Sequence, residues 1–518
     1  MQNTIQTNVI IVGAGPTGLS LAVQLMRYNI DFVIFDKKEG VTELSKALVV
    51  HARTLEIYDQ VDLAKKAVAG GEQVQQVAFM HDGKVSARLD FSDFGAGLSP
   101  FPFMLVFEQS KNEHLLYEHL QRNGKAVLWQ TELESLTQDA DNVRVVVKTI
   151  SGETQIIEAS YLVGCDGASS PTRQILGLPF EGSTHPRLFY VADVQMEFSK
   201  DEGTAYPVLG HDSFVLMVPM QDEKRWRLIG NLPEYEDEID REILFDAVEP
   251  KVKQLVQQPL EITALHWFST YKVHTRRAET FSAGRCFLAG DAAHIHTPAG
   301  GQGMNTGIQD AYNLAWKLAF VLRGNAHNSL LATYNEERVA NAKRLLQTTD
   351  QFFEVAASDR WYFRFFRDNI FPSIAGFVTQ FSAAKEFLFP MISQIGLDYR
   401  DSSLSQHQQS HFEVKAGDRM PYFLVSGENV YDQLRSPKFH LLVFSDGQHN
   451  DEYLKPELEE FGECIDFQII PLYPKVVEIF GSQKPFKVLL RPDNYIALLS
   501  PDCSLEDLKA YFCKVGLT

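Results

Sequence analysis

The sequence predicts an α/β fold in which a parallel-sheet domain is interrupted by a β-rich segment and followed by a smaller α/β domain. Three observations lead to this prediction. The start of the chain, TNVIIVGAGPTGLSLAVQLMRYNIDFVIFD, contains a strand, a glycine-rich turn, a helix and a second strand. Residues 185–275 contain long stretches rich in β-forming residues. Beyond residue 412, short apolar strands alternate with helical segments.

Length and composition fit a large globular protein. With 518 residues the chain exceeds what one hydrophobic core usually organises, so several domains are expected. Hydrophobic residues make up 45% and charged residues 22% of the chain, which is typical of a globular protein. The formal charge of -19, from 48 basic and 67 acidic residues, argues against nucleic acid as a partner.

The chain carries no signal for export or for a membrane. No apolar run approaches the roughly 20 residues that cross a bilayer. The first residues lack the charged region and the cleavage site of a signal peptide. We therefore predict a cytoplasmic protein with no membrane partner. The five cysteines form no C-x-x-C pair, so we expect reduced thiols, no metal site and no redox dithiol.

Changes of pattern along the chain predict the domain boundaries. Residues 1–180 should form the first part of the parallel-sheet domain, residues 181–278 a separate β-sheet, and residues 279–400 the second part with a helical region. Residues 400–411, RDSSLSQHQQSH, are polar and serine-rich, which is typical of a linker. Residues 412–518 should form a small α/β domain of thioredoxin-like order.

Local signals predict two helix starts and one hairpin. Ser110 with Glu113 matches a capping box at the start of the helix KNEHLLYEHLQ, and Ser504 with Asp507 matches another before the last helix. The stretch VRVVVKTI and the turn after it predict an antiparallel hairpin inserted in the parallel layer.

The glycine turn near the N-terminus predicts a dinucleotide site. Gly13, Gly15 and Gly18 match G-x-G-x-x-G between a strand and a helix, and Asp36 ends the next strand. The first glycine permits a tight turn, the second lets a pyrophosphate approach backbone N–H groups, and the third allows close helix–strand packing. Asp36 can accept hydrogen bonds from a ribose. The alternative is a turn that merely packs well.

A second glycine-rich stretch, GRCFLAGDAAHIHTPAGGQGMN at residues 284–305, indicates which dinucleotide to expect. Its apolar strand delivers Asp291 to the carboxyl end of the sheet, where ligands of open α/β folds bind. The amides that precede the following long helix can stabilise negative charge. A reduced flavin carries such a charge across N1 and the C2 carbonyl, whereas NAD has no equivalent. The stretch therefore predicts a flavin.

Three motifs together resemble the FAD-dependent aromatic hydroxylases, the single-component flavoprotein monooxygenases related to para-hydroxybenzoate and phenol hydroxylase. They are GAGPTG at 13–18, CDGASSPTR at 165–173 and GDAAHIHTPAGGQGMNTGIQDAYNLAWKL at 290–318. The likeness runs from Val9 to about Leu404, and RPDNYIALL resembles the thioredoxin-like tail of the phenol-hydroxylase and polyketide-hydroxylase branches. The resemblance implies an FAD-binding Rossmann-like (GR2-type) domain, an inserted β-rich substrate-binding domain and a thioredoxin-like C-terminal domain.

The resemblance also implies which residues bind the cofactor. They are Gly13, Ala14, Gly15, Pro16, Thr17, Gly18, Asp36, Lys37, Arg53, Gln109, Leu133, Asp166, Gly290, Asp291, Pro298, Gly301, Gln302, Gly303, Met304 and Asn305. Asp291 would hold the ribityl chain, Pro298 would lie against the isoalloxazine and position it, and the backbone of residues 301–305 would face the pyrimidine end. Asp166 would sit near the pyrophosphate and help with NADPH, with Arg173 as a nearby positive charge.

The remaining residues of this set would touch the dinucleotide half. Arg53 and Gln109 match positions that contact it, Lys37 would reach the adenosine, and Leu133 would offer a backbone contact to adenine. Two of the roles have structural alternatives, because Asp166 is also typical of a turn aspartate and Arg173 of a solvated helix charge. The pair His294 and His296 lacks a third ligand and the H-E-x-x-H pattern, which argues against zinc.

The family's reaction sets the expected partners. NADPH or NADH would reduce FAD, O2 would add at flavin C4a, and the hydroperoxide would hydroxylate a small phenolic or polycyclic aromatic substrate. No second G-x-G-x-x-G follows a strand, so the nicotinamide should bind transiently. Weak candidates for a substrate base in the β-rich segment are Tyr190, His211, His266 and Tyr271, each of which is more often a packed neighbour.

Other functions stay open on the sequence. A Baeyer–Villiger oxygenase acting on a polyketide-like or antibiotic substrate would use the same flavin loops. A non-catalytic flavin-binding redox sensor would also need them, with the C-terminal domain as its partner-binding module. A flavin-dependent halogenase is disfavoured because no W-x-W-x-I-P signature is present. A monomer or a homodimer is expected.

Overall fold

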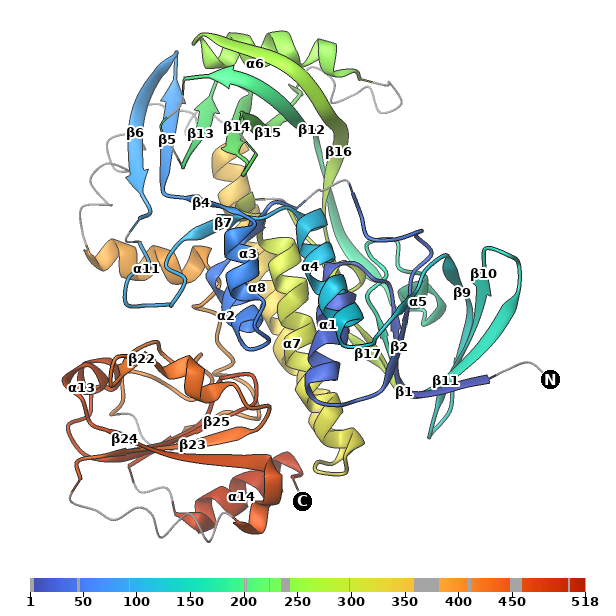
Figure 1. Ribbon diagram of the computed structural model, residues 1–518, viewed down its shortest axis with the longest axis vertical. Coiled ribbons are helices and arrows are strands. Elements are labelled where there is room, and N and C mark those ends of the chain that lie inside the picture. Colours follow the sequence, from blue (N-terminus) through green and yellow to red (C-terminus); the bar gives the residue numbers. More distant parts are fainter. Residues whose placement is uncertain are drawn as a thin grey trace.

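The structure is a computed structural model that describes residues 4–517 except for 44–46, 93, 200, 202, 223, 234–242, 298, 358–381, 408–410, 448–458 and 502–503. Within these residues, two sheets of eight strands and one of five strands organise the chain. Figure 1 shows the second sheet at the top and the C-terminal sheet at the lower left, with the long helix α7 descending from below the second sheet to the right of the C-terminal sheet. Among the described helices, none combines the length and the apolar character needed to cross a membrane.

The first sheet contains the strand that opens the chain. Its order is β17-β18-β11-β1-β2-β8, and β9 and β10 extend it from β11. The bounds are β1 Thr4–Val12, β2 Phe32–Phe35, β8 Val127–Leu128, β9 Thr131–Gln138, β10 Val143–Thr149, β11 Thr154–Gly164, β17 Ser282–Ala283 and β18 Cys286–Leu288. Strands β1, β2, β8, β11 and β18 run parallel, which confirms the predicted parallel layer. The predicted hairpin is confirmed by β10, which runs antiparallel to both of its neighbours.

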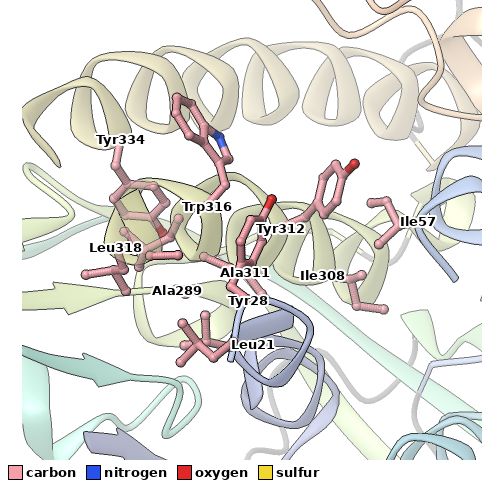
Figure 2. Close-up of a cluster of buried hydrophobic side chains, with 14 of the residues drawn as sticks. Leu21, Tyr28, Ile57, Ala289, Ile308, Ala311, Tyr312, Trp316, Leu318 and Tyr334 are labelled. Carbon is pink, nitrogen blue, oxygen red and sulfur yellow. The ribbon is translucent and has the colours of Figure 1, made fainter. Parts of the chain in front are cut away.

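Helices α1 (Pro16–Arg27) and α7 (Gln302–Leu322) pack against each other in the main hydrophobic core. Figure 2 shows Leu21 of α1 and Tyr28, which directly follows α1, close to Ala311 and Tyr312 of α7. Helix α7 is buried on every side from Asn305 to Phe320, because other elements surround it. The remaining described α-helices of this region are α2 Ala52–Asp59, α3 Ala64–Ala69, α4 Gln109–Arg122, α5 Pro171–Ile175, α8 Ala332–Ala357 and α11 Ser382–Ile392.

The second sheet has the order β19-β16-β12-β15-β14-β13-β5-β6. Its bounds are β5 Gln76–His81, β6 Lys84–Asp90, β12 Phe180–Phe198, β13 Thr204–Leu209, β14 Phe214–Pro219, β15 Arg225–Asn231, β16 Leu260–Ala278 and β19 His294–Ile295. Helix α6 (Glu249–Val256) covers one face through Val252 and Val256. The sheet extends beyond the predicted segment 181–278, because β5 and β6 come from earlier in the chain. The small sheet β3-β7-β4 comprises Val49–Val50, Met104–Val106 and Glu72–Val74.

The C-terminal sheet has the order β20-β26-β25-β23-β24. Its bounds are β20 Gln406–His407, β23 Phe439–Ser445, β24 Ile465–Pro471, β25 Phe486–Leu490 and β26 Ile496–Ser500, with a small hairpin of β21 Leu424–Val425 and β22 Glu428–Asn429. Strands β23 and β24 are parallel, whereas β25 is antiparallel to both β23 and β26. Helices α13 (Pro474–Phe480) and α14 (Leu505–Val515) complete this region.

The two predicted capping boxes have opposite outcomes. Ser504 and Asp507 form one at the start of α14, as expected. The prediction for Ser110 and Glu113 is wrong, because α4 begins at Gln109, two residues before the predicted start at Lys111, with Glu108 as its N-cap. The carboxylate of Glu113 instead accepts hydrogen bonds from the backbone amide of Thr42 and from a side chain of its own helix. Glu113 therefore makes a buried tertiary contact instead of the capping contact that the local pattern predicts.

Candidate cofactor site

The three sequence motifs meet at one edge of the first sheet. The amide of Cys165 donates to the carbonyl of Val12 at 2.7 Å, and the amide of Ala289 donates to the carbonyl of Gly164 at 3.0 Å. These bonds continue the parallel ladder past the ends of β1, β11 and β18. The glycine turn, the DG motif and the GD motif therefore lie side by side where a parallel α/β sheet binds its ligand.

The three glycines of the turn differ in what the fold itself demands of them. A Cβ on Gly13, whose φ is +100°, would lie 2.5 Å from the carbonyl oxygen of Cys165. A Cβ on Gly18 would lie 1.9 Å from the carbonyl oxygen of Gly13. By contrast, a Cβ on Gly15 would meet nothing within 4 Å, and its φ of -81° suits any residue. Packing therefore accounts for Gly13 and Gly18 but not for Gly15, which leaves the N-terminus of α1 open to a ligand.

Asp36 lies beside this turn, as its position at the end of β2 predicts. Its Oδ2 accepts a hydrogen bond from the amide of Ala14 at 2.7 Å, and its Oδ1 accepts one from the amide of Lys38 at 2.9 Å. The neighbouring Lys37 is exposed to solvent. The carboxylate of Asp36 is thus fixed next to Ala14, beside the open space in front of Gly15.

Thr17 fixes how closely α1 approaches the other two glycine-rich segments. A Cβ on Gly290 would lie 2.4 Å from the Oγ1 of Thr17, and a Cβ on Gly307 would lie 2.3 Å from the same atom. Pro16 occupies the first turn of α1, where its missing N–H costs nothing. The N-cap Gly15 brings no side chain to the N–H groups of α1, so a ligand can reach them.

The loop before α7 turns its carbonyl groups toward the protein. The carbonyl of Gly300 accepts a hydrogen bond from Nε2 of His51 at 2.9 Å, and that of Gly301 accepts one from Nδ2 of Asn305 at 2.9 Å. Because the described peptides are all trans, each N–H points opposite to its C=O. The amides of Gly301 and Gln302 therefore point away from His51 and Asn305. No side chain caps α7 within the described residues, so these donors suit a ligand with partial negative charge.

The side chains of His51 and Asn305 behind this loop bind the protein backbone. Asn305 is buried, and its Oδ1 accepts hydrogen bonds from the amide of His51 at 2.9 Å and from Oγ1 of Thr54 at 2.7 Å. Burial lowers the pKa of His51 to about 4, so the ring is neutral and uses its one N–H on Gly300. Burial also lowers the pKa of His296 to about 4. The positive potential at the loop thus comes from the helix rather than from these two rings.

Asp310 organises the GD motif, and the sequence analysis missed it. Its Oδ2 accepts hydrogen bonds from the amide of Gly290 at 2.9 Å and from Nε2 of His294 at 2.7 Å. Its Oδ1 accepts one from Nε of Arg338 at 2.6 Å. Burial alone would raise the pKa of Asp310, but Arg338 and His294 outweigh it and the pKa lies below its ordinary value. A carboxylate within a helix that is buried on all sides was the signal that could have revealed this residue.

Comparisons with known proteins decide the family. A family model described as an FAD binding domain matches residues 6–349. A flavin-dependent monooxygenase of Mycobacteroides abscessus is 32% identical over 95% of this chain and 97% of its own length. The chain belongs to the FAD-dependent monooxygenases. FAD is therefore its cofactor, and enzymes of this family use NAD(P)H and O2.

Further relatives agree with this assignment. The 6-methylpretetramide 4-monooxygenase of Streptomyces rimosus is 36% identical over 66% of this chain. The matched part spans 60% of the length of that relative. The solved structure of OxyS, an anhydrotetracycline hydroxylase from Streptomyces rimosus, covers 99% of this monooxygenase and 100% of its own chain at 26% identity, with a TM-score of 0.77. The whole described fold therefore has a counterpart among flavin enzymes.

The DG motif of this monooxygenase is tied to the other two motifs. Arg173 is buried, and its guanidinium donates to the carbonyl of Ala292 at 2.9 Å and stacks over the ring of Phe180. The alternative of a solvated charge is therefore wrong for Arg173. Asp166 accepts hydrogen bonds from Oγ of Ser170 and from the amide of Thr172, and burial raises its pKa. Its role toward the pyrophosphate and NADPH stays a prediction.

Three other predicted contacts have protein partners in the structure. Arg53 is fully buried and donates to Glu56 and to the carbonyl of Asp493. Gln109 exchanges hydrogen bonds with the backbone of Ala47. Leu133 packs in the core of the first sheet. Contacts of Arg53, Gln109 and Leu133 with the dinucleotide stay predictions.

The flavin-proximal residues have different surroundings. Asp291 is exposed next to the buried Gly290, and Met304 packs partly against the main core. A Cβ on Gly303 would lie 3.5 Å from Nε2 of His296, an ordinary contact distance. Pro298 lies outside the described residues, so its predicted position against the isoalloxazine stays a prediction.

The candidate bases do not come together. Tyr190 faces α6 within the second core cluster, whereas Tyr271 pairs with Phe189 and lies on the opposite face of the sheet. His211 and His266 are both exposed. Burial raises the pKa of Tyr271 to about 12, although Arg227 lowers it in part, so its hydroxyl keeps its proton at neutral pH. Tyr271 is therefore suited to donate a hydrogen bond rather than to act as a base.

A buried ion pair on the same face as Tyr271 was not anticipated. Arg227 binds Asp193 through two hydrogen bonds of 2.6 and 2.7 Å. Pairing across the strands places Val218, Arg227, Asp193 and Trp267 in one row on this face. Val218 packs in a small cluster with Val49, whose side chain lies against Gly301. This face of the second sheet is therefore the one turned toward the loop before α7.

Proposed function

We propose that this FAD-dependent monooxygenase hydroxylates a small aromatic substrate, phenolic or polycyclic. In the overall reaction the substrate, O2, NAD(P)H and a proton yield the hydroxylated substrate, NAD(P)+ and water. When bound, FAD supplies the redox chemistry: it takes two electrons from NAD(P)H and delivers one oxygen atom from its C4a side. The observation that carries the proposal is the direction of the amides of Gly301 and Gln302. They point away from the side chains of His51 and Asn305, which bind the carbonyl groups of the same two peptides.

The protein's own residues would then bind and orient. The amides before α7 would stabilise negative charge at the pyrimidine end, and the N-terminus of α1 would hold the pyrophosphate over Gly15. Asp36 would accept hydrogen bonds from the adenosine ribose, and Asp310 would keep Gly290 and Asp291 in place for the ribityl chain. None of these tasks requires a nucleophile or a metal ion.

The second sheet would provide the substrate surface. The face turned toward the loop carries Phe189, Tyr271 and Trp267, whose rings can pack on an aromatic substrate, and the pair Asp193–Arg227. Tyr271, which keeps its proton at neutral pH, would donate a hydrogen bond to a substrate oxygen. Tyr190 faces α6, so it is a poor candidate for contact with the substrate. The base that would help to ionise a phenol stays unassigned.

The names of the relatives suggest which rings to test first. Matched relatives include a 6-methylpretetramide 4-monooxygenase, a pentachlorophenol 4-monooxygenase and an anhydrotetracycline monooxygenase. We therefore propose polycyclic phenols of the aromatic-polyketide type as the first substrate class and simple phenols as the second. A nicotinamide cofactor would bind only transiently, because the chain has a single G-x-G-x-x-G turn after a strand.

The C-terminal region is proposed to be a thioredoxin-like domain with a structural role. Its order β26-β25-β23-β24, with β23 and β24 parallel and β25 antiparallel, supports this proposal. The described cysteines, Cys165, Cys286, Cys464 and Cys513, form no disulfide with one another, and Cys503 lies outside the described residues. We propose that the enzyme works as a monomer or homodimer in the cytoplasm, with neither nucleic acid nor a membrane as partner.

One experiment tests the proposed reaction. The purified protein should carry FAD, seen in its visible spectrum, and candidate aromatics should accelerate NADPH or NADH oxidation. Mass spectrometry should then find a product heavier by one oxygen atom, and NMR should locate a new hydroxyl on the ring. An ester or lactone would identify a Baeyer–Villiger oxygenase instead. NADPH oxidation that no substrate stimulates would favour a redox sensor.

A further inference from the structure

Helix α2 is attached to the loop before α7 at its N-terminal end. His51, which precedes the helix, donates from its backbone to Oδ1 of Asn305 and from Nε2 to the carbonyl of Gly300, each at 2.9 Å. Thr54 donates from Oγ1 to the same Oδ1 at 2.7 Å. The position of α2 therefore sets where the carbonyl of Gly300 points, and with it the direction of the next amide.

The same helix is attached to the C-terminal region on its other side. Nη2 of Arg53 donates to the carbonyl of Asp493 at 2.9 Å, and Nη1 of Arg419 donates to Oε1 of Glu56 at 3.0 Å. Arg53 and Glu56 also bind each other at 3.1 Å. The side chains of Arg53 and Glu56 are each 2% exposed, and that of Arg419 is 8% exposed. These contacts are therefore shielded from water and salt, unlike surface ion pairs.

Asp493 is itself held firmly. It follows β25, and its carboxylate accepts hydrogen bonds from Nε of Arg491 at 2.9 Å and from Nε1 of Trp316 in α7 at 3.1 Å. Arg491 also binds Glu337 of α8. Lys317 of α7 donates to the same Glu337 at 2.7 Å. The turn between β25 and β26 is thus fixed to α7 and α8, and it presents a rigid carbonyl to Arg53.

We infer that Arg419 and Arg53 are positioning residues for the flavin: through α2, the C-terminal domain sets the direction of the amides before α7. Arg53 is only two residues from His51, and one helical turn joins Arg53 and Glu56, so a shift of α2 moves the bonds to Asn305 and Gly300 directly. The inference rests on the proposed role of this loop at the pyrimidine end of FAD. It assigns the C-terminal domain a part in cofactor binding.

The test compares three substitutions of the same kind in the holoenzyme. Arg419→Met and Arg53→Met each remove one attachment between α2 and the C-terminal region. Arg400→Met is the control for loss of an arginine ion pair that does not touch α2, because Arg400, whose side chain is 51% exposed, binds Asp418 through two hydrogen bonds of 2.6 and 3.0 Å. For each protein the FAD dissociation constant is measured from flavin fluorescence, together with the visible spectrum and the midpoint potential of bound FAD.

We expect the FAD dissociation constant to rise roughly tenfold in Arg419→Met and in Arg53→Met. Their midpoint potential should become more negative, because misdirected amides stabilise the anionic reduced flavin less well. The control should match the unmodified enzyme in both readouts. Arg419→Lys, which keeps the charge near Glu56, should recover part of the affinity, and it replaces Arg419→Met if that variant does not fold.

Other results would overturn the inference. If Arg53→Met alone weakens FAD binding, Arg53 touches the cofactor directly and Arg419 has no positioning role. If the Arg419 variants lower the melting temperature but leave affinity, spectrum and potential unchanged, the contact is merely structural. If the unmodified protein binds no FAD, the proposed function itself fails, which is a distinguishable outcome.

Discussion

Asp310 and Arg338 form a fully buried ion pair, with 2.6 Å between Nε of the arginine and Oδ1 of the aspartate. The other oxygen of Asp310 accepts hydrogen bonds from Gly290 and His294. One carboxylate therefore holds both ends of the short segment that carries Asp291. The sheet brings Asp291 to the right edge, but Asp310 fixes the local backbone on which its position depends.

The first prediction concerns this carboxylate. Asp310→Asn keeps the shape of the side chain but leaves the buried Arg338 without a counter-charge. Breaking a buried pair in this way typically costs about 3–5 kcal/mol. We expect the free energy of unfolding to fall by about that amount in denaturant titrations, and the purified variant to retain less FAD.

The control for Asp310→Asn is Asp398→Asn. Asp398 pairs with Arg344 at 2.9 Å, but the arginine side chain is 46% exposed. Surface pairs of this kind contribute about 0–1 kcal/mol, so stability and FAD content should hardly change. Equal stability losses in the two variants would contradict the role assigned to Asp310.

The second prediction separates the glycines of the first motif. Gly15→Ala should fold with an unchanged melting temperature, because its Cβ meets no protein atom within 4 Å, but it should bind FAD more weakly. Gly18→Ala should lower the melting temperature itself, because its Cβ would lie 1.9 Å from the carbonyl oxygen of Gly13. Thermal unfolding and fluorescence titration with FAD measure both effects. Full FAD affinity in Gly15→Ala would mean that the open space does not hold the pyrophosphate.

The third prediction is a pH dependence of stability. Burial favours the neutral form of Glu337, but Arg491 and Lys317 outweigh it and hold the pKa of Glu337 below its ordinary value of 4.5. A carboxyl group with a depressed pKa in the folded state contributes stability that is complete above 4.5 and is lost as the pH falls below it. We expect the free energy of unfolding to decrease as the pH is lowered from 4.5.

Glu337→Gln tests the source of that dependence. The variant should be less stable at neutral pH, because Arg491 and Lys317 lose their shared partner. Its stability should also change less between neutral pH and values below 4.5 than that of the unmodified protein. An identical slope in both proteins would show that other carboxyl groups cause the acid sensitivity.

The motifs predicted which segments lie together at the candidate site, because parallel strands bring their carboxyl ends to one edge whatever the rest of the chain does. Gly13, Asp166 and Gly290 meet there as expected. The ion pairs Asp310–Arg338 and Asp193–Arg227 could not be predicted, because each joins two separate elements. Local signals failed for the same reason: Glu113 binds Thr42 instead of capping α4.

The predicted linker illustrates the same limit. Serine-rich composition predicted a linker at 400–411, and within it Ser402 is buried and donates from Oγ to Oε1 of Glu337 at 2.7 Å. Ser405 donates from Oγ to the carbonyl of Tyr399 at 2.8 Å. Polar residues join two domains tightly when buried partners satisfy them, and composition alone does not reveal those partners.

The last prediction concerns Tyr271. Because burial raises its pKa to about 12, its hydroxyl should orient the substrate without titrating near neutral pH. Tyr271→Phe should therefore raise KM for the aromatic substrate and uncouple part of the NADPH oxidation, while the shape of the pH–rate profile stays the same. Tyr190→Phe, on the face covered by α6, is the control and should leave KM unchanged. Steady-state rates over a range of pH, with hydroxylated product quantified by mass spectrometry, measure both effects. Loss of a pH-dependent limb in Tyr271→Phe would show that the tyrosine acts as the base after all.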